Sequence, residues 1–326
     1  LQIPVLRHIE LFLLLLWLRF KGYKKFFIRI TAFSSIISSL VARISFGQTY
    51  LWQSGTSKAF NSQKKISLST LLWGVKSWLP NKIARFMTNY FVTGPETMID
   101  YYVENERIPK SKIKLLFNDI DTKIFAPLEQ SLLIQNKNKF LTSLNLDLDT
   151  KIILLVHKFS PIRMTNIYLK EIFKDFREVD SPKILFVFVG DGEDLSKAKA
   201  LKIRFGLDKK ALFLGSKPNS EILKLYQISD VFINPSFTEG FPRVLIEAMA
   251  CGLPIVTTDA GGTKDILSEE QKKYLVSKDK PSDFSYSLKA LINTNYKEIG
   301  LKNIQHVKKY DTAVVAEQYI NKIFYE

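Results

Sequence analysis

The sequence is poor in the residues that build disulfides and metal sites. It has 1 cysteine, Cys251, so a disulfide within the chain is excluded, and a reducing compartment fits this composition. Cys251 precedes a glycine at the expected end of a helix, and we interpret it as a packing residue. With only 3 histidines beside that cysteine, no metal-ligand cluster is formed, and we expect no metal.

Long hydrophobic runs are also lacking. The most apolar segment, residues 9–18, has about half of the roughly 20 residues that a membrane-spanning helix needs, and Arg19 and Lys21 follow it. We therefore expect a buried or interfacial helix at this position.

Acidic residues are nearly absent from residues 1–95. This segment holds 13 lysines and arginines against one acid, Glu10, while the whole chain carries a net charge of +15. Tryptophan and phenylalanine are interleaved with the basic residues, which is typical of nucleic-acid or anionic membrane contact. No nucleic-acid motif is present, so we favour an anionic membrane surface at the cytoplasmic, inner face of the membrane. A soluble domain that happens to be basic is the alternative.

The second half of the chain alternates short apolar runs with amphipathic segments. The 326 residues suffice for two α/β domains. We expect strands at 151–156, 183–189, 211–214, 231–234 and 254–258, and helices at 167–176, 195–205, 220–228 and 243–250. This alternation predicts a parallel, doubly wound sheet that binds its ligand at the carboxyl ends of the strands.

The first half is less regular. We expect strands at 86–93 and 112–117, a helix at 95–103, a polar connection at 128–146 and a C-terminal helix at 312–325.

Two glutamates stand in the stretch 230–262. Glu239 falls in a turn after an apolar run, and Glu247 lies inside the helix that follows. The turn between them presents backbone N–H groups at a helix N-terminus, which favours an anion such as a phosphate. Two carboxylates beside an anion cradle indicate a nucleotide-sugar ligand. The alternative is a generic strand–turn–helix with surface glutamates.

The motif residues of this stretch resemble the signature of the retaining, GT-B-fold glycosyltransferases of family 4 (group 1). They are Pro235-Ser236, Glu239-Gly240-Phe241, Glu247-Ala248-Met249-Ala250-Cys251-Gly252 and Pro254. The resemblance implies an α/β GT-B fold, in which two Rossmann-like domains face a cleft. The expected parts are an acceptor-side domain at 1–125, a donor-binding domain at 126–308 and a C-terminal helix at 309–326 that packs back on the first domain.

The resemblance covers residues 86–326 well and residues 1–85 poorly. The Gly-rich turn that the family carries after its first strand is not found, and the chain begins with Leu1 rather than methionine. We therefore expect the N-terminal domain to be incomplete or divergent.

The family's two diphosphate-binding cations fall on the loop after residues 151–156. Lys158 stands at the arginine position and Arg163 at the lysine position of the pattern Gly-Arg-x-x-x-x-Lys-Gly. His157 and Met164 replace the two glycines. His157 either donates a hydrogen bond to the ligand or is simply packed.

The resemblance also assigns the remaining site residues. Glu239 would bind hydroxyls of the transferred sugar and, with Lys158 and Arg163, carry the catalysis. Glu247 would bind the ribose. The expected phosphate cradle and nucleotide border consist of Gly240, Phe241, Val244, Leu245, Gly190 and Lys217. Asn118 opens the loop that leads from the first domain into the hinge.

The implied activity is transfer, with retention of configuration, from a UDP- or GDP-linked sugar to a lipid-linked, polysaccharide or other glycan acceptor. No metal cofactor and no nucleic acid are expected. Two other hypotheses remain open: a non-catalytic nucleotide-sugar-binding partner subunit, and an isomerase similar to nucleotide-sugar 2-epimerases.

Overall fold

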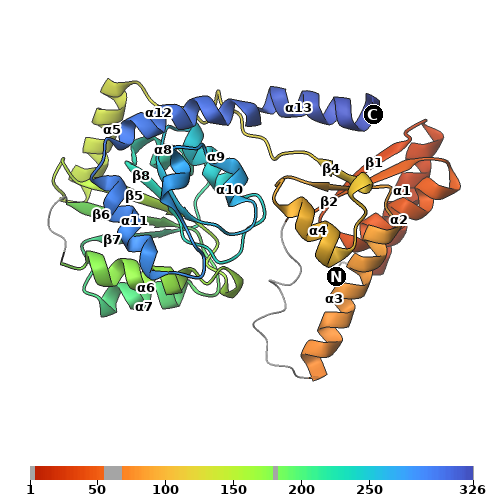
Figure 1. Ribbon diagram of the computed structural model, residues 1–326, viewed down its shortest axis with the longest axis horizontal. Helices are drawn as coiled ribbons and strands as arrows, with labels where there is room; N and C mark the ends of the chain where they lie inside the picture. Colours follow the sequence, from red (N-terminus) through yellow and green to blue (C-terminus); the bar gives the residue numbers. More distant parts are fainter. Residues whose placement is uncertain (1–3, 55–67, 179–182, 326) are drawn as a thin grey trace. The chain divides into compact units, whose positions relative to one another are not determined.

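The computed structural model describes residues 4–54, 68–178 and 183–325. The chain divides into two compact units, and each is described by itself. Unit 1 comprises Leu1–Phe117 and Ala316–Glu326, and unit 2 comprises Asn118–Val315 (Figure 1). These limits lie a few residues away from the limits expected at 125 and 308.

Unit 2 is built on a six-stranded sheet in the order β10-β9-β8-β5-β6-β7, in which every pair is parallel. The strands are β5 (Lys151–Val156), β6 (Ile184–Val189), β7 (Ala211–Gly215), β8 (Val231–Asn234), β9 (Ile255–Thr258) and β10 (Leu275–Val276). The strand order reverses between β5 and β8, since β5 pairs with β6 on one side and with β8 on the other. In doubly wound sheets this switch point is where ligands bind. The expected sheet is therefore confirmed.

Helices cover both faces of this sheet (Figure 1). They are α5 (Gln130–Ser143), α6 (Thr165–Phe176), α7 (Leu195–Arg204), α8 (Asn219–Ile228), α9 (Arg243–Ala250), α10 (Thr263–Ile266), α11 (Ser282–Ile292) and α12 (Tyr296–Val307). Short 3-10 turns follow at η3 (Pro161–Arg163), η4 (Gln271–Tyr274) and η5 (Lys308–Tyr310). The segment expected as a polar connection at 128–146 contains α5, of which only Leu141 is fully buried.

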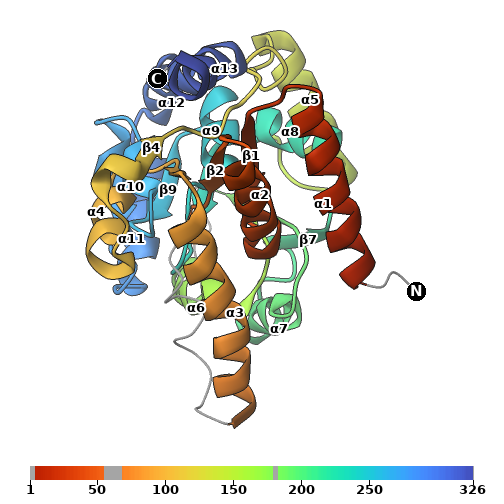
Figure 2. The same ribbon diagram turned by 90° about the vertical axis from the view of Figure 1, so that its right-hand side faces the viewer.

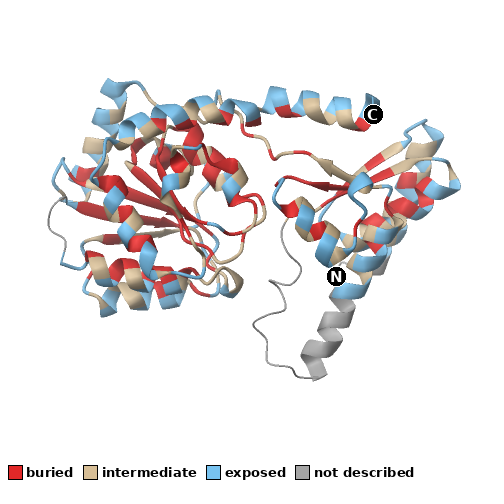
Figure 3. Ribbon diagram, viewed as in Figure 1, coloured by how far each residue is buried: buried red, intermediate tan, exposed pale blue. Residues whose placement is uncertain are grey.

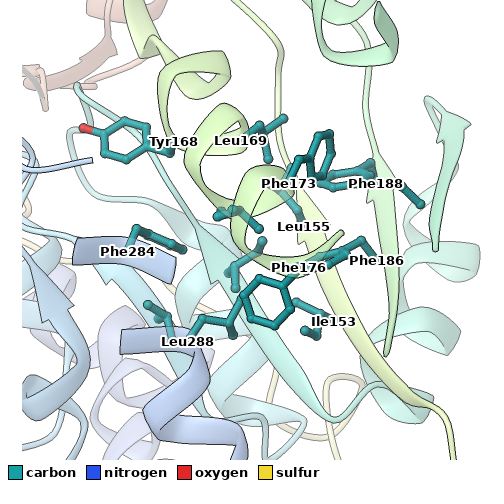
Figure 4. Close-up of a cluster of buried hydrophobic side chains, with 14 of the residues drawn as sticks. Ile153, Leu155, Tyr168, Leu169, Phe173, Phe176, Phe186, Phe188, Phe284 and Leu288 are labelled. Carbon is teal, nitrogen blue, oxygen red and sulfur yellow. The ribbon is translucent and has the colours of Figure 1, made fainter. Parts of the chain in front are cut away.

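The core of unit 2 explains why its strands are apolar throughout. Every residue of β6 is buried, because both faces of the parallel sheet are covered. On one face, phenylalanines of α6 and β6 pack with Phe284 and Leu288 of α11 (Figure 4). Each such side chain contributes about 1.5–3 kcal/mol when fully buried. Burial accordingly concentrates on the strands and on the inner sides of the helices (Figure 3).

Unit 1 has a four-stranded parallel sheet in the order β1-β2-β3-β4. Its strands are β1 (Lys25–Arg29), β2 (Gln48–Trp52), β3 (Tyr90–Thr93) and β4 (Ile113–Leu115). Its helices are α1 (Pro4–Phe20), α2 (Ala32–Ile44), α3 (Leu68–Met87) and α4 (Met98–Glu106), with a 3-10 turn η2 (Lys110–Lys112). The strand expected at 86–93 is shorter than predicted, because α3 continues through Met87. The expected helix at 95–103 begins three residues later and runs to Glu106.

The last turns of the chain pack on the sheet of unit 1. Helix α13 (Thr312–Ile320) is followed by a π-helical turn, η6 (Asn321–Tyr325). The Tyr50 hydroxyl donates to the Ile323 carbonyl at 3.2 Å, and Lys322 Nζ donates to the Leu115 carbonyl at 2.9 Å. Ile323 is buried with Tyr50 and Trp52. These contacts hold residues after 315 in unit 1.

Helix α1 contains the most apolar segment of the chain and lies beside α2 (Figure 2). Leu15 is buried against Phe26, Ile28 and Val41, so one side of the helix belongs to a core. No helix within the described ranges combines the length and the apolar character needed to cross a membrane.

The two ends of unit 2 meet. A parallel bridge joins Ile120 to Asp311. The Ile120 N–H donates to the Tyr310 carbonyl at 2.9 Å, and the Thr312 N–H donates to the Ile120 carbonyl at 3.0 Å. The segment therefore enters and leaves unit 2 at one place.

Candidate functional site

The loop after β5 is held against the loop after β6 by close backbone contact. The His157 N–H donates to the Val189 carbonyl at 2.9 Å. Gly190, at φ +130°, lies so close that a Cβ at this position would be 1.8 Å from the His157 carbonyl oxygen. Gly192 approaches the Phe159 carbonyl in the same way, at 2.1 Å. Gly190 was expected to border the nucleotide, and the structure shows why glycine is required there: it fixes the loop that carries Lys158 and Arg163.

A buried ion pair lies at the switch point of the sheet. Arg163, on the loop after β5, places its Nη1 2.7 Å from Oε1 of Glu239, which follows β8. The Glu239 side chain is only 4% exposed, whereas that of Arg163 is 29% exposed. Burial raises the pKa of the Glu239 carboxyl above its ordinary value, and the Arg163 charge opposes this rise. The fold thus joins two of the predicted catalytic residues from distant parts of the sequence.

The His157 side chain contacts the Arg163 guanidinium. Its Nδ1 lies 3.2 Å from Arg163 Nη1, and its Nε2 lies 2.6 Å from the Thr165 hydroxyl oxygen. Because a guanidinium only donates, Nδ1 must accept, which leaves the proton on Nε2 to be donated to Thr165. Burial, followed by the Arg163 charge, holds the pKa of His157 well below its ordinary value, so the ring is neutral. Of the two interpretations of His157, this geometry favours packing: both ring nitrogens are engaged within the protein.

Glu247 is also held by one side chain. The Tyr226 hydroxyl on α8 donates to Glu247 Oε2 at 3.1 Å. Burial raises the pKa of the Glu247 carboxyl, while the Tyr226 hydrogen bond and the Arg243 charge oppose the rise. The tyrosine thus fixes one of the two carboxylate oxygens.

The turn before α9 differs in one detail from the expected phosphate cradle. The Leu245 N–H donates to the Pro242 carbonyl at 3.1 Å, so it already has a partner. The Leu245 side chain is also fully buried, and its place in a phosphate cradle stays a prediction. The Val244 side chain is half-buried. Helix α9 begins after Pro242 without a side-chain cap, which leaves the dipole end available to an anion.

A glycine turn after β9 braces the Glu239 turn. Gly261 has φ +54°, and a Cβ there would lie 2.0 Å from the Glu239 carbonyl oxygen. The Gly262 N–H donates to the Gly240 carbonyl at 2.9 Å. Phe241 is buried with its ring against Tyr310, and Asn118 Nδ2 donates to the Phe241 carbonyl at 3.3 Å. The predicted hinge residue therefore contacts the turn that carries Glu239.

The two predicted lysines lie at the surface. Lys158 is exposed and makes no ion pair within the described part of the chain. Lys217 pairs with Glu221 at 3.0 Å on α8, a half-exposed pair that solvent weakens. Neither lysine touches the Arg163–Glu239 pair.

Sequence reasoning missed the neighbours of that pair. Asn234 ends β8 and is fully buried, yet neither its Oδ1 nor its Nδ2 has a hydrogen-bond partner. Thr165 and Tyr226 were not predicted either. In the sequence, Asn234 could have been recognised as the polar residue at the end of an otherwise apolar strand.

No group of three or more histidine, cysteine, aspartate or glutamate residues in the described part of the chain could hold a metal ion. Cys251 is buried, and burial raises the pKa of its thiol.

Residues 136–309 match the family model of the glycosyl transferases group 1. The chain belongs to this family. Its relatives include an uncharacterized glycosyltransferase of Methanocaldococcus jannaschii, 28% identical over 65% of this chain and 54% of that protein. Another is the UDP-Gal:alpha-D-GlcNAc-diphosphoundecaprenol alpha-1,3-galactosyltransferase of Escherichia coli, 25% identical over 76% of this chain and 61% of that protein. The chain thus spans about half the length of the first of these relatives.

The fold of this glycosyl transferases group 1 chain is also that of solved structures. The Anabaena protein HepE, solved in complex with UDP, superimposes with a TM-score of 0.73 over 92% of this chain and 79% of its own, at 15% sequence identity. This likeness shows the α/β GT-B fold.

Proposed function

We propose that this chain is a retaining glycosyltransferase that moves a sugar from a nucleotide-sugar donor to a lipid-linked, polysaccharide or other glycan acceptor. The observation that carries the proposal is the Arg163–Glu239 pair at the carboxyl ends of β5 and β8. Guanidinium groups suit diphosphates and carboxylates suit sugar hydroxyls, and here one of each lies side by side at the switch point, where doubly wound sheets bind ligands.

A uridine donor is supported by the similar proteins. The Anabaena structure has been solved with UDP and with UDP-glucose, and the name of the Escherichia coli relative includes UDP-Gal. We therefore place UDP-linked sugars before GDP-linked ones. The same Escherichia coli name describes a lipid-linked diphosphate acceptor, which supports that acceptor class.

The proposed chemistry relies on charge at the leaving group. As the glycosidic bond breaks, negative charge grows on the diphosphate, and Lys158 and Arg163 stabilise it. Arg163 reaches Glu239 through Nη1 alone, so Nη2 and Nε remain for a phosphate oxygen. The departing diphosphate takes the proton of the acceptor hydroxyl, so the reaction needs neither a metal nor a covalent intermediate. Glu239 would bind the sugar hydroxyls and Glu247 the ribose, because carboxylates accept hydroxyl protons and repel phosphate.

Titration calorimetry with UDP, GDP and UDP-glucose tests the donor site. We expect one nucleotide to bind selectively, and Lys158→Ala to weaken it by about tenfold, as loss of one charge-assisted contact predicts. Lys224→Ala is the matched control, because Lys224 is also an exposed lysine but lies on α8. This variant is expected to bind like the wild type. Equal affinities of the two variants would contradict the role of Lys158.

Turnover distinguishes the classes of function. Incubation with a nucleotide-sugar and a diphosphoundecaprenol-linked acceptor should yield a glycosylated lipid. Binding without transfer would instead indicate a partner subunit, and conversion of the donor without acceptor would indicate an isomerase.

We further propose that unit 1 binds an anionic membrane surface at the inner, cytoplasmic face. One side of α1 exposes large apolar side chains three or four residues apart: Leu6, Ile9, Leu13, Trp17 and Phe20. The exposed cations Arg7, Lys21 and Lys24 flank this side, a combination that suits the interface of an anionic bilayer. Lys58, Lys64 and Lys65, which also make residues 1–95 basic, lie outside the described residues.

Vesicle flotation tests the membrane proposal. Leu13→Glu and Trp17→Glu together should abolish binding to phosphatidylserine-containing vesicles, and binding by the wild type should fall with salt. Ile203→Glu, at an equally exposed position of unit 2, is the control and should bind normally. Wild-type binding that is absent, or equal on neutral vesicles, would contradict the proposal.

A further inference from the structure

Asn234 is a polar side chain at an apolar position. The other residues of β8 are Val231, Phe232 and Ile233, and all four positions of the strand are buried. Asn234 has no exposed surface, and neither of its amide atoms has a hydrogen-bond partner. Buried amides without partners are rare because they lose their bonds to water without replacement. A leucine of similar size would fill this position at lower cost to stability, so the asparagine needs another explanation.

The amide lies beside two groups of the site. The Asn234 amide lowers the pKa of Glu239 and raises the pKa of His157, against the effect of burial on each. It therefore stabilises the charged form of both side chains. It does so without reaching normal hydrogen-bond geometry to either group. The amide therefore lies beside the Glu239 carboxylate and the His157 ring, at the site rather than in the general core.

Glu239 has a corresponding need. Its carboxylate receives a hydrogen bond from Arg163 on Oε1, and the Ser236 side chain also opposes the rise in its pKa, although the Ser236 hydroxyl donates to the Thr238 carbonyl at 2.9 Å. In the proposed function Arg163 also holds the donor diphosphate. A guanidinium that is shared between two anions stabilises the charge of each anion less than that of a single partner. Glu239 remains only 4% exposed, so water does not replace the lost stabilisation. When the donor is bound, the carboxylate gains from a further hydrogen-bond donor, and the Ser236 hydroxyl is already engaged with the Thr238 carbonyl.

We propose that Asn234 is a positioning residue that holds Glu239 in the donor-bound protein. As the diphosphate draws on Arg163, the Asn234 amide donates to the Glu239 carboxylate and keeps it directed at the sugar hydroxyls. This inference rests on the proposed function and concerns the same site. It implies that Asn234 weakens the ligand-free protein and strengthens the hold on the sugar.

Asn234→Leu separates the two effects. The ligand-free variant should unfold at the same denaturant concentration as the wild type or at a higher one. Its Kd for UDP should stay within about twofold, because the nucleotide does not require Glu239. Its Kd for UDP-glucose should rise about tenfold, the loss expected for one hydrogen bond to a charged group. The same comparison is made with two other nucleotide-sugars: UDP-galactose against UDP, and GDP-mannose against GDP.

Asn303→Leu is the matched control. Asn303 is equally buried in unit 2, but its Nδ2 donates to the Leu253 carbonyl and to Gln271 Oε1, both at 2.9 Å. Its replacement should lower the denaturation midpoint and leave the affinity ratio between nucleotide-sugar and nucleotide unchanged. A residue with a purely structural role behaves in this way.

The outcomes distinguish this inference from the proposed function. A wild-type protein that binds none of the nucleotide-sugars overturns both. Wild-type binding with an unchanged affinity ratio in Asn234→Leu overturns the role of Asn234 alone. Equal loss of UDP and UDP-glucose affinity also overturns it, since the effect would then not be specific to the sugar. A changed ratio with an unchanged or raised midpoint supports the inference.

Discussion

Replacing Arg163 with methionine should expose the dependence of the buried Glu239 on this ion pair. Arg163→Met keeps the side-chain length and removes the charge 2.7 Å from Glu239 Oε1. Breaking a buried ion pair from one side costs about 3–5 kcal/mol. The Arg163 side chain is 29% exposed, and Glu239 can escape by taking up a proton. We therefore expect a loss of about 2–3 kcal/mol at pH 8.

The loss should depend on pH with a definite sign. Burial already raises the pKa of Glu239 above its ordinary value of 4.5, and removal of Arg163 raises it further. Between 4.5 and that raised pKa, the folded protein binds more protons than the unfolded chain. The contribution of this carboxyl to stability is then fully present below 4.5 and is lost as the pH rises through the folded pKa. The cost of Arg163→Met should be small at pH 5 and should grow toward pH 8.

Urea denaturation followed by circular dichroism measures this cost. The 4 tryptophans all lie in the first 95 residues, so tryptophan fluorescence reports on unit 1 and provides an internal control. The double variant Arg163→Met/Glu239→Gln should recover most of the loss at pH 8. Lys217→Met, which breaks a half-exposed pair with Glu221, should change stability by less than about 1 kcal/mol. An equal cost at pH 5 and pH 8, or no recovery in the double variant, would refute the reasoning.

Three further predictions concern the surroundings of the pair. Gly190→Ala places a Cβ 1.8 Å from the His157 carbonyl oxygen at φ +130°, and we expect a loss of more than about 3 kcal/mol in urea denaturation; a loss below 1 kcal/mol would be inconsistent with that contact. Met164→Gly relieves a left-handed residue at φ 50° and should stabilise by about 0.5–1 kcal/mol after the entropy of glycine is subtracted; a lower denaturation midpoint would contradict this. Tyr226→Phe removes the 3.1 Å hydrogen bond to Glu247 and should weaken UDP binding about fivefold in calorimetry, whereas unchanged binding would separate Glu247 from the nucleotide.

Much of the donor-side fold could be predicted because its strands are continuous apolar runs bounded by turn residues. Residues 151–156 and 231–234 were predicted to the residue. Helix α5 was missed because a polar helix with one fully buried side chain leaves almost no periodic signal. The start of β3 was misplaced because Phe86 and Met87 are apolar like the strand, although they end α3.

The site could be predicted only as far as its motif extends along the chain. The resemblance to the family motif indicated Arg163 and Glu239, but not that their side chains would pair. The roles of His157 and Asn234 depend on atoms brought together across the sheet, and neighbouring residues in the sequence carry no sign of them. The hydrogen bond of the Leu245 N–H to the Pro242 carbonyl could not be predicted, because it depends on how tightly this turn closes.

The bridge between Ile120 and Asp311 gives unit 2 adjoining ends. A segment that leaves the chain where it entered can be exchanged between genes as one piece, because the host chain has only a single narrow gap to close. Recombination can thus join the same unit 2 to many different forms of unit 1. The family model accordingly matches residues 136–309, which lie entirely within this one unit.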